Sequence, residues 1–305
     1  MKEKLGVLTC FHFYKNTTLK EVLHDTMPGL PILIDSGGFS AFSQGAVIDL
    51  DEYGRWSRRN RTPDTNCISL DVIGSAGKSS INISRLKPYG DYMPCVHVGS
   101  SPDWIDRYHD RGFRYMCLGG MVPFLKGGQT KSKEATGRLM KFIHACHDRA
   151  DALGVDLHGL GCTTWDIVRK FPWRSVDSSF QNMGVRFGYP VRVYDHATRK
   201  WHYIGLRDPK SVLPAMGLIR EYGYNPFPLL HDSPHTNETV LGLSVASVER
   251  WQKDQRRAPF VYFADGNKDH VRAIARMIYT EKPATMDWRY DDWYGNNDQQ
   301  PTGAV

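Results

Sequence analysis

Short apolar runs alternate with amphipathic stretches along most of the chain, and this alternation limits the fold more than any other feature. The amphipathic stretches predict helices at 51–60, 102–111, 132–153 and 163–171. Regular alternation of strand and helix predicts βαβ units and a parallel sheet. The apolar runs, each predicted to be a buried strand, read KLGVLTCF, PILIDSGG, NCISLDVIG, YMPCVHVG, FRYMCLGGMV, VDLHGLGC, RSVDSS and, near the end, FVYFADG.

Nearly all of these predicted strands end in Gly, Asp or Ser, as in IDSGG, LDVIG, HVGSS, LGGM, HGLG and VDSS. In a (β/α)8 barrel the active site is assembled at the carboxyl ends of all the strands, so a repeated polar ending is expected there. A doubly wound sheet binds its ligand at a single switch point instead. The pattern therefore favours an α/β fold of the (β/α)8 TIM-barrel type.

The pattern changes after residue 179. The segment PVRVYDHATRKWHYIGL alternates around a turn and predicts a β-hairpin insertion at about 190–206. Helices are then expected at 211–222, 237–255 and 268–281. We therefore expect one TIM-barrel domain over residues 1–281 and a polar C-terminal tail, 282–305, that forms a strap or is disordered.

Composition and cysteine usage exclude several classes of protein. With 305 residues and 41% hydrophobic side chains the chain can bury a large core. It has neither a signal-peptide pattern nor an apolar run of membrane-spanning length, so we expect a soluble, cytoplasmic protein with no membrane partner. Its six cysteines are scattered singly without a C-x-x-C pair, so we expect small buried side chains, no disulfide framework, no zinc site built on cysteines and no cofactor.

The net charge is +6, and basic residues cluster in RWSRRNR and KDQRR. Such clusters suit a polyanion, although ordinary solvated helix faces carry them too. The residues predicted to contact nucleic acid are Arg55, Arg58, Arg59 and Arg61.

Three aspartates stand at predicted strand ends: Asp35 in IDSGGF, Asp71 in SLDVIG and Asp177 in SVDSSF. Between the last two come the Gly119–Gly120 pair of LGGMVP and the HGLG motif. Each feature alone has a simple structural explanation. Asp35 can form a turn with the glycines that follow it, and Asp71 and Asp177 can each cap a helix.

Taken in order, these five strand ends resemble those of the tRNA-guanine transglycosylase superfamily. Its members carry D-S-G-G-[FY], a later aspartate, G-G-[LM], G-[VL]-G and then an aspartate nucleophile, and all five occur here in residues 32–180. The resemblance implies exchange of guanine in a polynucleotide for a 7-deazaguanine base by two displacements at the sugar C1′.

The resemblance also implies a role for each matching residue. Asp177 is the expected nucleophile, Asp35 the general acid/base, and Asp71 the carboxylate that reads the guanine edge. The remaining residues expected at the base are Ser36 and Gly37 of the first motif, Phe39 stacking on the base, Gly119 and Gly120 offering backbone N–H groups, and His158 on the other face.

The chemistry of the residues agrees with these roles. Guanine and 7-deazaguanines present two parallel donors, N1–H and the exocyclic amine, that a carboxylate accepts well. The oxocarbenium-like centre left at C1′ needs an anionic nucleophile beside it, as in retaining glycoside hydrolysis. Aspartates in different environments can divide these tasks.

The chain also departs from the tRNA-acting members. Those members hold zinc with Cys-x-Cys-x-x-Cys and a distant His, whereas no cysteine follows Cys162 here. With its short length and hairpin insertion, the chain is more similar to the DNA-modifying branch (DpdA-like) found in phages and bacterial genomic islands. We therefore expect a preQ0-like base to replace guanine in DNA through a covalent aspartyl-sugar intermediate, without a metal.

Three alternatives stay open at this stage. The same exchange could act on tRNA, or the chain could be a catalytically silent nucleic-acid-binding subunit. An unrelated barrel hydrolase could use His12 on a metal, although only one histidine stands in the first strand segment. Histidines that invite a metal interpretation elsewhere, with surface or boundary positions as the simpler reading, are His144, His147, His231 and His235.

Overall fold

Eight strands form one parallel sheet in the order β3-β2-β1-β10-β7-β6-β5-β4. The structure is a computed structural model, and it describes residues 2–125, 133–162, 164–231 and 233–280. The strands are β1 (Leu5–Cys10), β2 (Ile32–Asp35), β3 (Thr65–Cys67), β4 (Cys95–His97), β5 (Tyr115–Gly119), β6 (Asp156–Gly159), β7 (Ser175–Ser178) and β10 (Phe260–Ala264).

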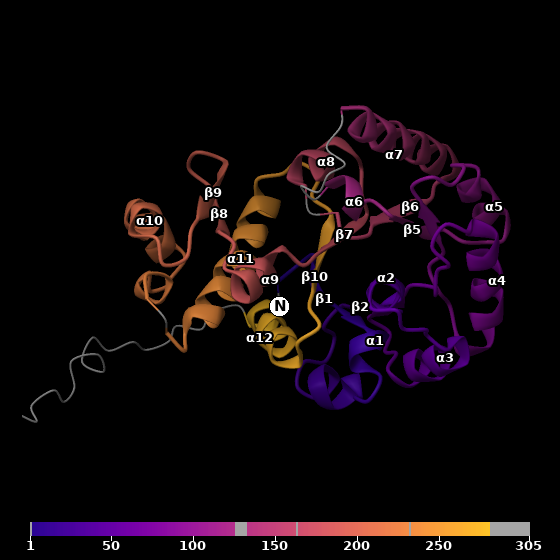
Figure 1. Cartoon of the computed structure of the whole chain (residues 1–305), viewed down its shortest axis with the longest axis horizontal. Coiled ribbons are helices and arrows are strands. Elements are labelled where there is room, and N and C mark those ends of the chain that lie inside the picture. The colour runs from indigo at the N-terminus through magenta and orange to yellow at the C-terminus, as the bar shows by residue number, and fades with distance from the viewer. Residues whose placement is uncertain (1, 126–132, 163, 232, 281–305) are drawn as a thin grey trace, which may run out of the picture.

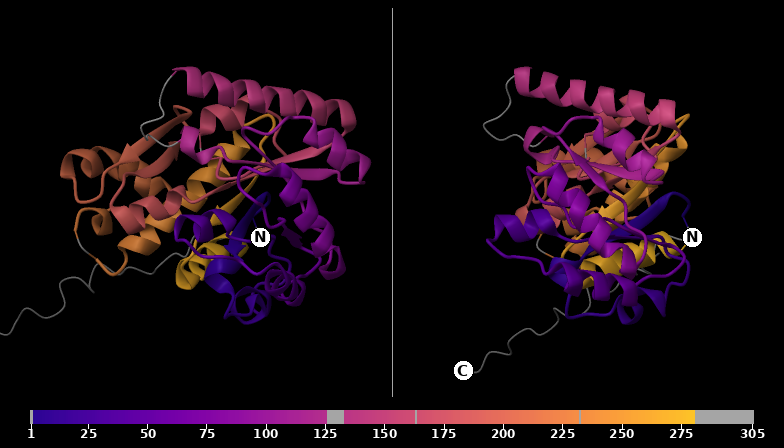
Figure 2. Two further views of the ribbon diagram at one scale, coloured as in Figure 1. Left: turned by 45° about the vertical axis from the view of Figure 1, so that its right-hand side comes forward. Right: turned by 90° about the vertical axis from the view of Figure 1, so that its right-hand side faces the viewer.

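This sheet curls, and helices surround it on the outside (Figures 1 and 2). Its two edge strands, β3 and β4, are connected by one parallel bridge between Ile68 and Met93. Around that bridge the Ser69 N–H donates to Met93 O at 2.9 Å, and the Met93 N–H donates to Cys67 O at 2.8 Å. The α/β architecture and the parallel, curled, TIM-like sheet agree with the prediction.

Side chains alternate along each strand between two buried layers. Val7, Ile32 and Val261 point outward into the large core beneath the helices. Leu8 and Tyr262 belong to a second core cluster that also takes side chains from β2, β4 and β5. All six cysteines are buried and unpaired, as expected.

Seven observed helices lie within about two residues of the predicted ones, and five helices have no predicted counterpart: α1, α2, α4, α6 and α9. Helix α4 was missed because its sequence, AGKSSINISRL, is rich in residues of low helix propensity. The helices are α1 (Phe11–Tyr14), α2 (Gly38–Ser43), α3 (Leu50–Arg59), α4 (Ala76–Leu86), α5 (Trp104–Asp110), α6 (Val122–Leu125), α7 (Lys133–Leu153), α8 (Trp165–Lys170), α9 (Phe180–Phe187), α10 (Pro209–Glu221), α11 (Thr236–Lys253) and α12 (Lys268–Tyr279).

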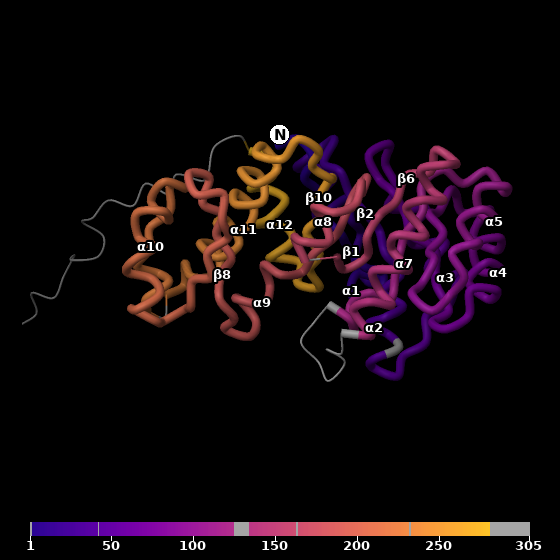
Figure 3. Tube along the Cα trace, turned by 90° about the horizontal axis from the view of Figure 1, so that it is seen from above, coloured from indigo at the N-terminus to yellow at the C-terminus, as the bar shows by residue number. Residues whose placement is uncertain are grey.

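The predicted hairpin insertion is present as β8 (Val191–Asp195) paired antiparallel with β9 (Lys200–Ile204). Together with α10 it lies at one end of the molecule, next to α11 (Figure 3). Helix α11 joins this part to the barrel, because Val240 and Leu243 pack in the hairpin's own core while Leu241 and Val245 pack in the main one.

The predicted tail and strap, 282–305, lie outside the described residues. Within the described part of the chain, no helix combines the length and the apolar character that crossing a membrane requires.

Candidate active site

The three aspartates singled out in the sequence lie at the carboxyl ends of their strands. Asp35 is the last residue of β2, Asp71 follows β3, and Asp177 lies in β7. The negative charges of Asp71 and Asp177 both act to raise the pKa of Asp35, so the three carboxylates are close enough to influence one another. The fold therefore gathers them at one mouth of the barrel.

Asp177 is held firmly through one of its two carboxylate oxygens. Its Oδ1 accepts a hydrogen bond from the Gly161 N–H at 2.8 Å and lies 3.2 Å from His158 Nε2. The side chain is only 10% exposed. Helix α9 begins after Ser179 without a side-chain cap, so Asp177 does not serve as its cap.

His158 lies behind Asp177 at the start of a buried chain of hydrogen bonds. Its Nδ1 bonds Ser175 Oγ, and Ser175 Oγ bonds the Tyr115 hydroxyl. In the tautomer in which Nε2 donates to Asp177, Nδ1 accepts from Ser175 and Ser175 accepts from Tyr115. The ring of His158 is fully buried, which makes it a support for Asp177 and differs from the expected contact with the base.

Asp35 occupies a very different environment. Burial raises its pKa to about 7, and the charges of Asp71 and Asp177 add to this effect. The hydrogen bond from the Gly37 N–H to Asp35 Oδ2, at 2.9 Å, acts in the opposite direction. Asp35 is thus both a turn-forming residue and a carboxyl group poised to exchange a proton near neutral pH.

The glycines of IDSGG serve the protein's own packing. Gly37 has φ +77°, and a Cβ there would lie 2.5 Å from Cys10 Sγ and 2.6 Å from the Cβ of His12. Ser36 is buried and accepts a hydrogen bond from the Gly38 N–H at 3.2 Å. These residues shape the turn, and Phe39, which follows it and is 60% exposed, has a ring free to stack.

Asp71 faces His97, a residue that the sequence analysis did not single out. His97 Nε2 lies 3.2 Å from Asp71 Oδ2, and the Ser69 hydroxyl donates to Oδ1 at 3.2 Å. Burial acts to lower the pKa of His97, but the hydrogen bond to Asp71 and its charge outweigh burial and raise it. The cap of α4 is Ser75, so Asp71 is not a helix cap.

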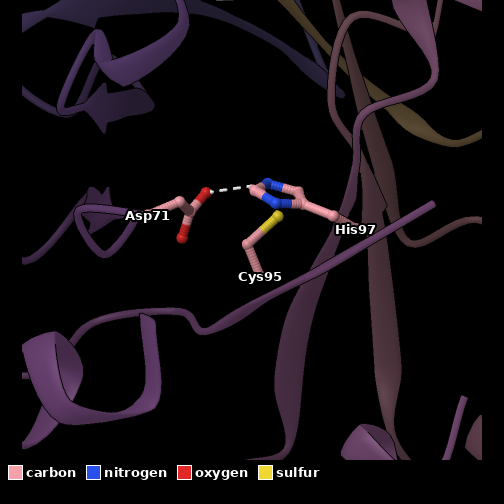
Figure 4. A group of neighbouring side chains, drawn as sticks. All are labelled: Asp71, Cys95 and His97. Atoms are coloured by element: carbon pink, nitrogen blue, oxygen red, sulfur yellow. Dashed lines mark ion pairs between the residues drawn. The ribbon is translucent and has the colours of Figure 1, made fainter. Parts of the chain in front are cut away.

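Cys95 completes this group. Ligand atoms of Asp71, Cys95 and His97 all lie within 4.8 Å of one another, the one cluster of three such residues in the part of the chain described here (Figure 4). The signal for it in the sequence is the C-x-H spacing of CVHVG, which places two donors on the same face of a strand. The histidines that invited a metal interpretation, His144, His147, His231 and His235, are not part of it.

The two glycines of LGGM border the same group. Gly119 is buried, and a Cβ there would lie 2.7 Å from Cys95 Sγ and 2.8 Å from His97 Nε2. Gly120 is exposed and has φ +73°. Gly119 therefore leaves room for Cys95 and His97, while the backbone of Gly120 is accessible from outside.

The basic run is not brought to the aspartates. Arg58 and Arg59 form the last turn of α3, shortly before β3 begins at Thr65, whereas the aspartates lie at the opposite ends of the strands. Basic side chains in this turn also complement the helix dipole. Arg61 stacks 4.5 Å from the centroid of the Tyr92 ring.

Comparison with known proteins adds no relative: no family model, curated protein or solved structure matches the chain. The ordered motifs and the geometry at the mouth of the barrel are therefore the observations that bear on function.

Proposed function

We propose that this protein is a transglycosylase that replaces guanine in DNA with a preQ0-like 7-deazaguanine base on a (β/α)8 barrel, through a covalent aspartyl-sugar intermediate. One observation carries the proposal: two carboxyl groups at the same mouth have different surroundings. Asp177 is anchored by donors through Oδ1, and Asp35 has a pKa raised to about 7 by burial and by neighbouring charge. A nucleophile and a general acid need this division.

In the first displacement Asp177 Oδ2 attacks the sugar C1′ while the C1′–N9 bond to guanine breaks. The departing purine takes the proton of the neutral Asp35. In the second displacement the incoming 7-deazaguanine attacks C1′ through N9, its N9 proton passes to the Asp35 carboxylate, and the ester bond to Asp177 breaks. Both residues return to their starting states, so no cofactor is consumed.

The base would lie between the strand ends that surround these carboxylates. Asp71 would accept the two parallel donors of the guanine edge, Gly120 would offer its exposed backbone N–H, and Phe39 would stack on the ring. His158 contributes through Asp177 in this proposal, because its ring is buried and both of its nitrogens are engaged. A target nucleotide in duplex DNA would have to be flipped out to reach C1′.

The path of the polynucleotide is restricted if Arg55, Arg58 and Arg59 contact its phosphates. Arg58 and Arg59 end α3 near the amino-terminal ends of the β-strands, opposite the ends that carry the aspartates. The polynucleotide would therefore have to run along the outside of α3 to reach both. Arg61 would contribute less, because its guanidinium already stacks on Tyr92.

The test is incubation of the protein with guanine-containing DNA, and separately with tRNA, each with a 7-deazaguanine base, followed by mass spectrometry of the nucleosides. The proposal expects incorporation into DNA. Incorporation into tRNA alone would assign the same chemistry to the other polynucleotide. Absence of incorporation into both would favour the silent binding subunit.

A further inference from the structure

We propose that Asp71, Cys95 and His97 form a binding site for a divalent transition metal ion, best matched by Zn²⁺, that connects β3 to β4. The proposal goes beyond base exchange, because it concerns how the barrel is held together as well as what lies at its mouth. It also departs from the expectation of a metal-free protein, which weighed cysteine-rich zinc motifs and histidines elsewhere in the chain, but not Asp71, Cys95 and His97 together.

The geometry places three donors around one point. Cys95 and His97 are two residues apart on β4, so both side chains face the same side of the strand, and Asp71 approaches from the end of β3. Their ligand atoms lie within 4.8 Å of one another. Around zinc, tetrahedral ligand atoms with bonds of about 2.0–2.3 Å lie roughly 3.3–3.8 Å apart, so small side-chain shifts suffice.

The mixture of donors selects the class of ion. A thiolate, an imidazole and a carboxylate suit zinc, whereas magnesium and calcium prefer sets of oxygen ligands. Three protein ligands leave a fourth position open, which is typical of zinc sites that accept water or a substrate atom. Space beside the donors is kept by Gly119, where a Cβ would lie 2.7 Å from Cys95 Sγ and 2.8 Å from His97 Nε2.

The metal site lies between β3 and β4, where a bound ion would stabilise the sheet. Each neighbouring pair of strands in the eight-stranded sheet has a ladder of at least two residue pairs, whereas β3 and β4 share only the Ile68–Met93 bridge. An ion held by Asp71 on one side and by Cys95 and His97 on the other would reinforce this weakest junction. Metal binding that requires the folded geometry stabilises the fold by mass action.

The site restricts the role proposed for Asp71 in base recognition. Oδ2 is the oxygen nearest His97 Nε2, and Oδ1 is the oxygen that accepts from Ser69. An ion bound at Oδ2 would leave only Oδ1 for the base, so Asp71 would accept one of the two parallel donors while the ion is present.

The experiment measures binding and stability without any nucleic acid, so its outcome is independent of base exchange. The full-length protein is freed of metal with a chelator and titrated with Co²⁺, since a cysteine ligand adds an intense near-ultraviolet thiolate-to-cobalt absorption. Zn²⁺ is then added to displace the cobalt, and the thermal unfolding midpoint is recorded with and without Zn²⁺. We expect one equivalent of Co²⁺ with the thiolate band, displacement by Zn²⁺, and a higher midpoint with Zn²⁺.

Two substitutions in the site and one outside it make the test specific. Cys95→Ala should abolish the thiolate band and the Zn²⁺-dependent rise in midpoint, and His97→Gln should weaken Co²⁺ binding by at least about 100-fold. Cys146→Ala removes an equally buried thiol from α7 and should keep both signals. Absence of a thiolate band in the unsubstituted protein, a band that survives in Cys95→Ala, or unchanged Co²⁺ affinity in His97→Gln overturns the proposal.

Discussion

Two Asp–His pairs stand at the mouth of this barrel, and both have the same contact distance. His158 Nε2 lies 3.2 Å from Asp177, and His97 Nε2 lies 3.2 Å from Asp71. Their surroundings differ: the side chain of His158 is fully buried and its second nitrogen bonds Ser175, whereas that of His97 is 17% exposed and lies beside Cys95 Sγ. The first pair holds a buried carboxylate in place, and the second belongs to the metal site proposed above.

The contact with histidine alone does not define what each aspartate can do. Asp177 receives a backbone N–H in addition to its histidine, and both contacts are made to Oδ1. Asp71 faces a histidine whose pKa is raised and a thiol that can become a metal ligand. The following predictions separate the two pairs.

The largest effect is expected at Asp177. Asp177→Ala and Asp177→Asn should each lower base exchange by more than about 1,000-fold, because neither side chain can form the glycosyl ester at C1′. Incorporation is measured by nucleoside mass spectrometry. Asp110→Asn, which alters a carboxylate that is 81% exposed on α5, serves as the control. Activity within tenfold of the unsubstituted protein in either Asp177 variant means that the nucleophile is elsewhere.

The next largest effect concerns the protonation of Asp35. In the proposed first displacement guanine takes a proton from neutral Asp35, whose pKa is raised to about 7, so the rate should fall about tenfold per pH unit above pH 7. Asp35→Asn should lower that rate by about 10²- to 10⁴-fold and remove this dependence. A single-turnover rate that stays constant from pH 6 to 9 would contradict the role of Asp35.

The raised pKa of Asp35 should also make the free energy of unfolding decrease as the pH rises. Folding favours the neutral form of Asp35, so its contribution is fully present below the ordinary pKa of 3.8 and is lost as the pH rises through about 7. The side chain in Asp35→Asn stays neutral at both pH values. The free energy of unfolding of this variant, relative to that of the unsubstituted protein, should therefore be higher at pH 8 than at pH 4. Denaturant unfolding at the two pH values measures this difference.

A smaller effect is expected from the support behind the nucleophile. His158→Ala should lower kcat by about 10- to 100-fold with little change in KM, because Asp177 loses a donor that orients it. His158→Gln should restore part of kcat, since its amide can donate to Asp177 again. A change in KM alone would instead indicate that His158 contacts the base.

The smallest effect is expected from the basic run on α3. If Arg55, Arg58 and Arg59 contact phosphates, replacing all three with Ala should reduce the slope of log affinity against log salt by about 0.9 per lost contact, equally for all sequences. Fluorescence anisotropy over a range of salt concentrations measures the slope. An unchanged slope would place the phosphate contacts nearer the mouth of the barrel.

The fold could be predicted because strands and helices have different periods, and the hairpin because its alternation ends at a turn. The carboxylates Asp35, Asp71 and Asp177 could be predicted because parallel strands end at a common edge. Their partners could not, since Ser175, Tyr115 and His97 reach the site only through strand register and curling of the sheet. The weak helix former α4 was missed for a local reason, the low helix propensity of its serines, glycine and asparagine.

The central claim, that Asp177 forms a bond to the sugar, is tested most directly by trapping that bond. The protein is mixed with a guanine-containing DNA oligonucleotide in the absence of free base, quenched in acid and digested, and the peptides are mapped by mass spectrometry. The account predicts a nucleotide adduct on the peptide that contains Asp177, lost in Asp177→Asn and discharged when a 7-deazaguanine base is added before quenching. An adduct on another carboxylate, or exchange that proceeds without any adduct, would contradict it.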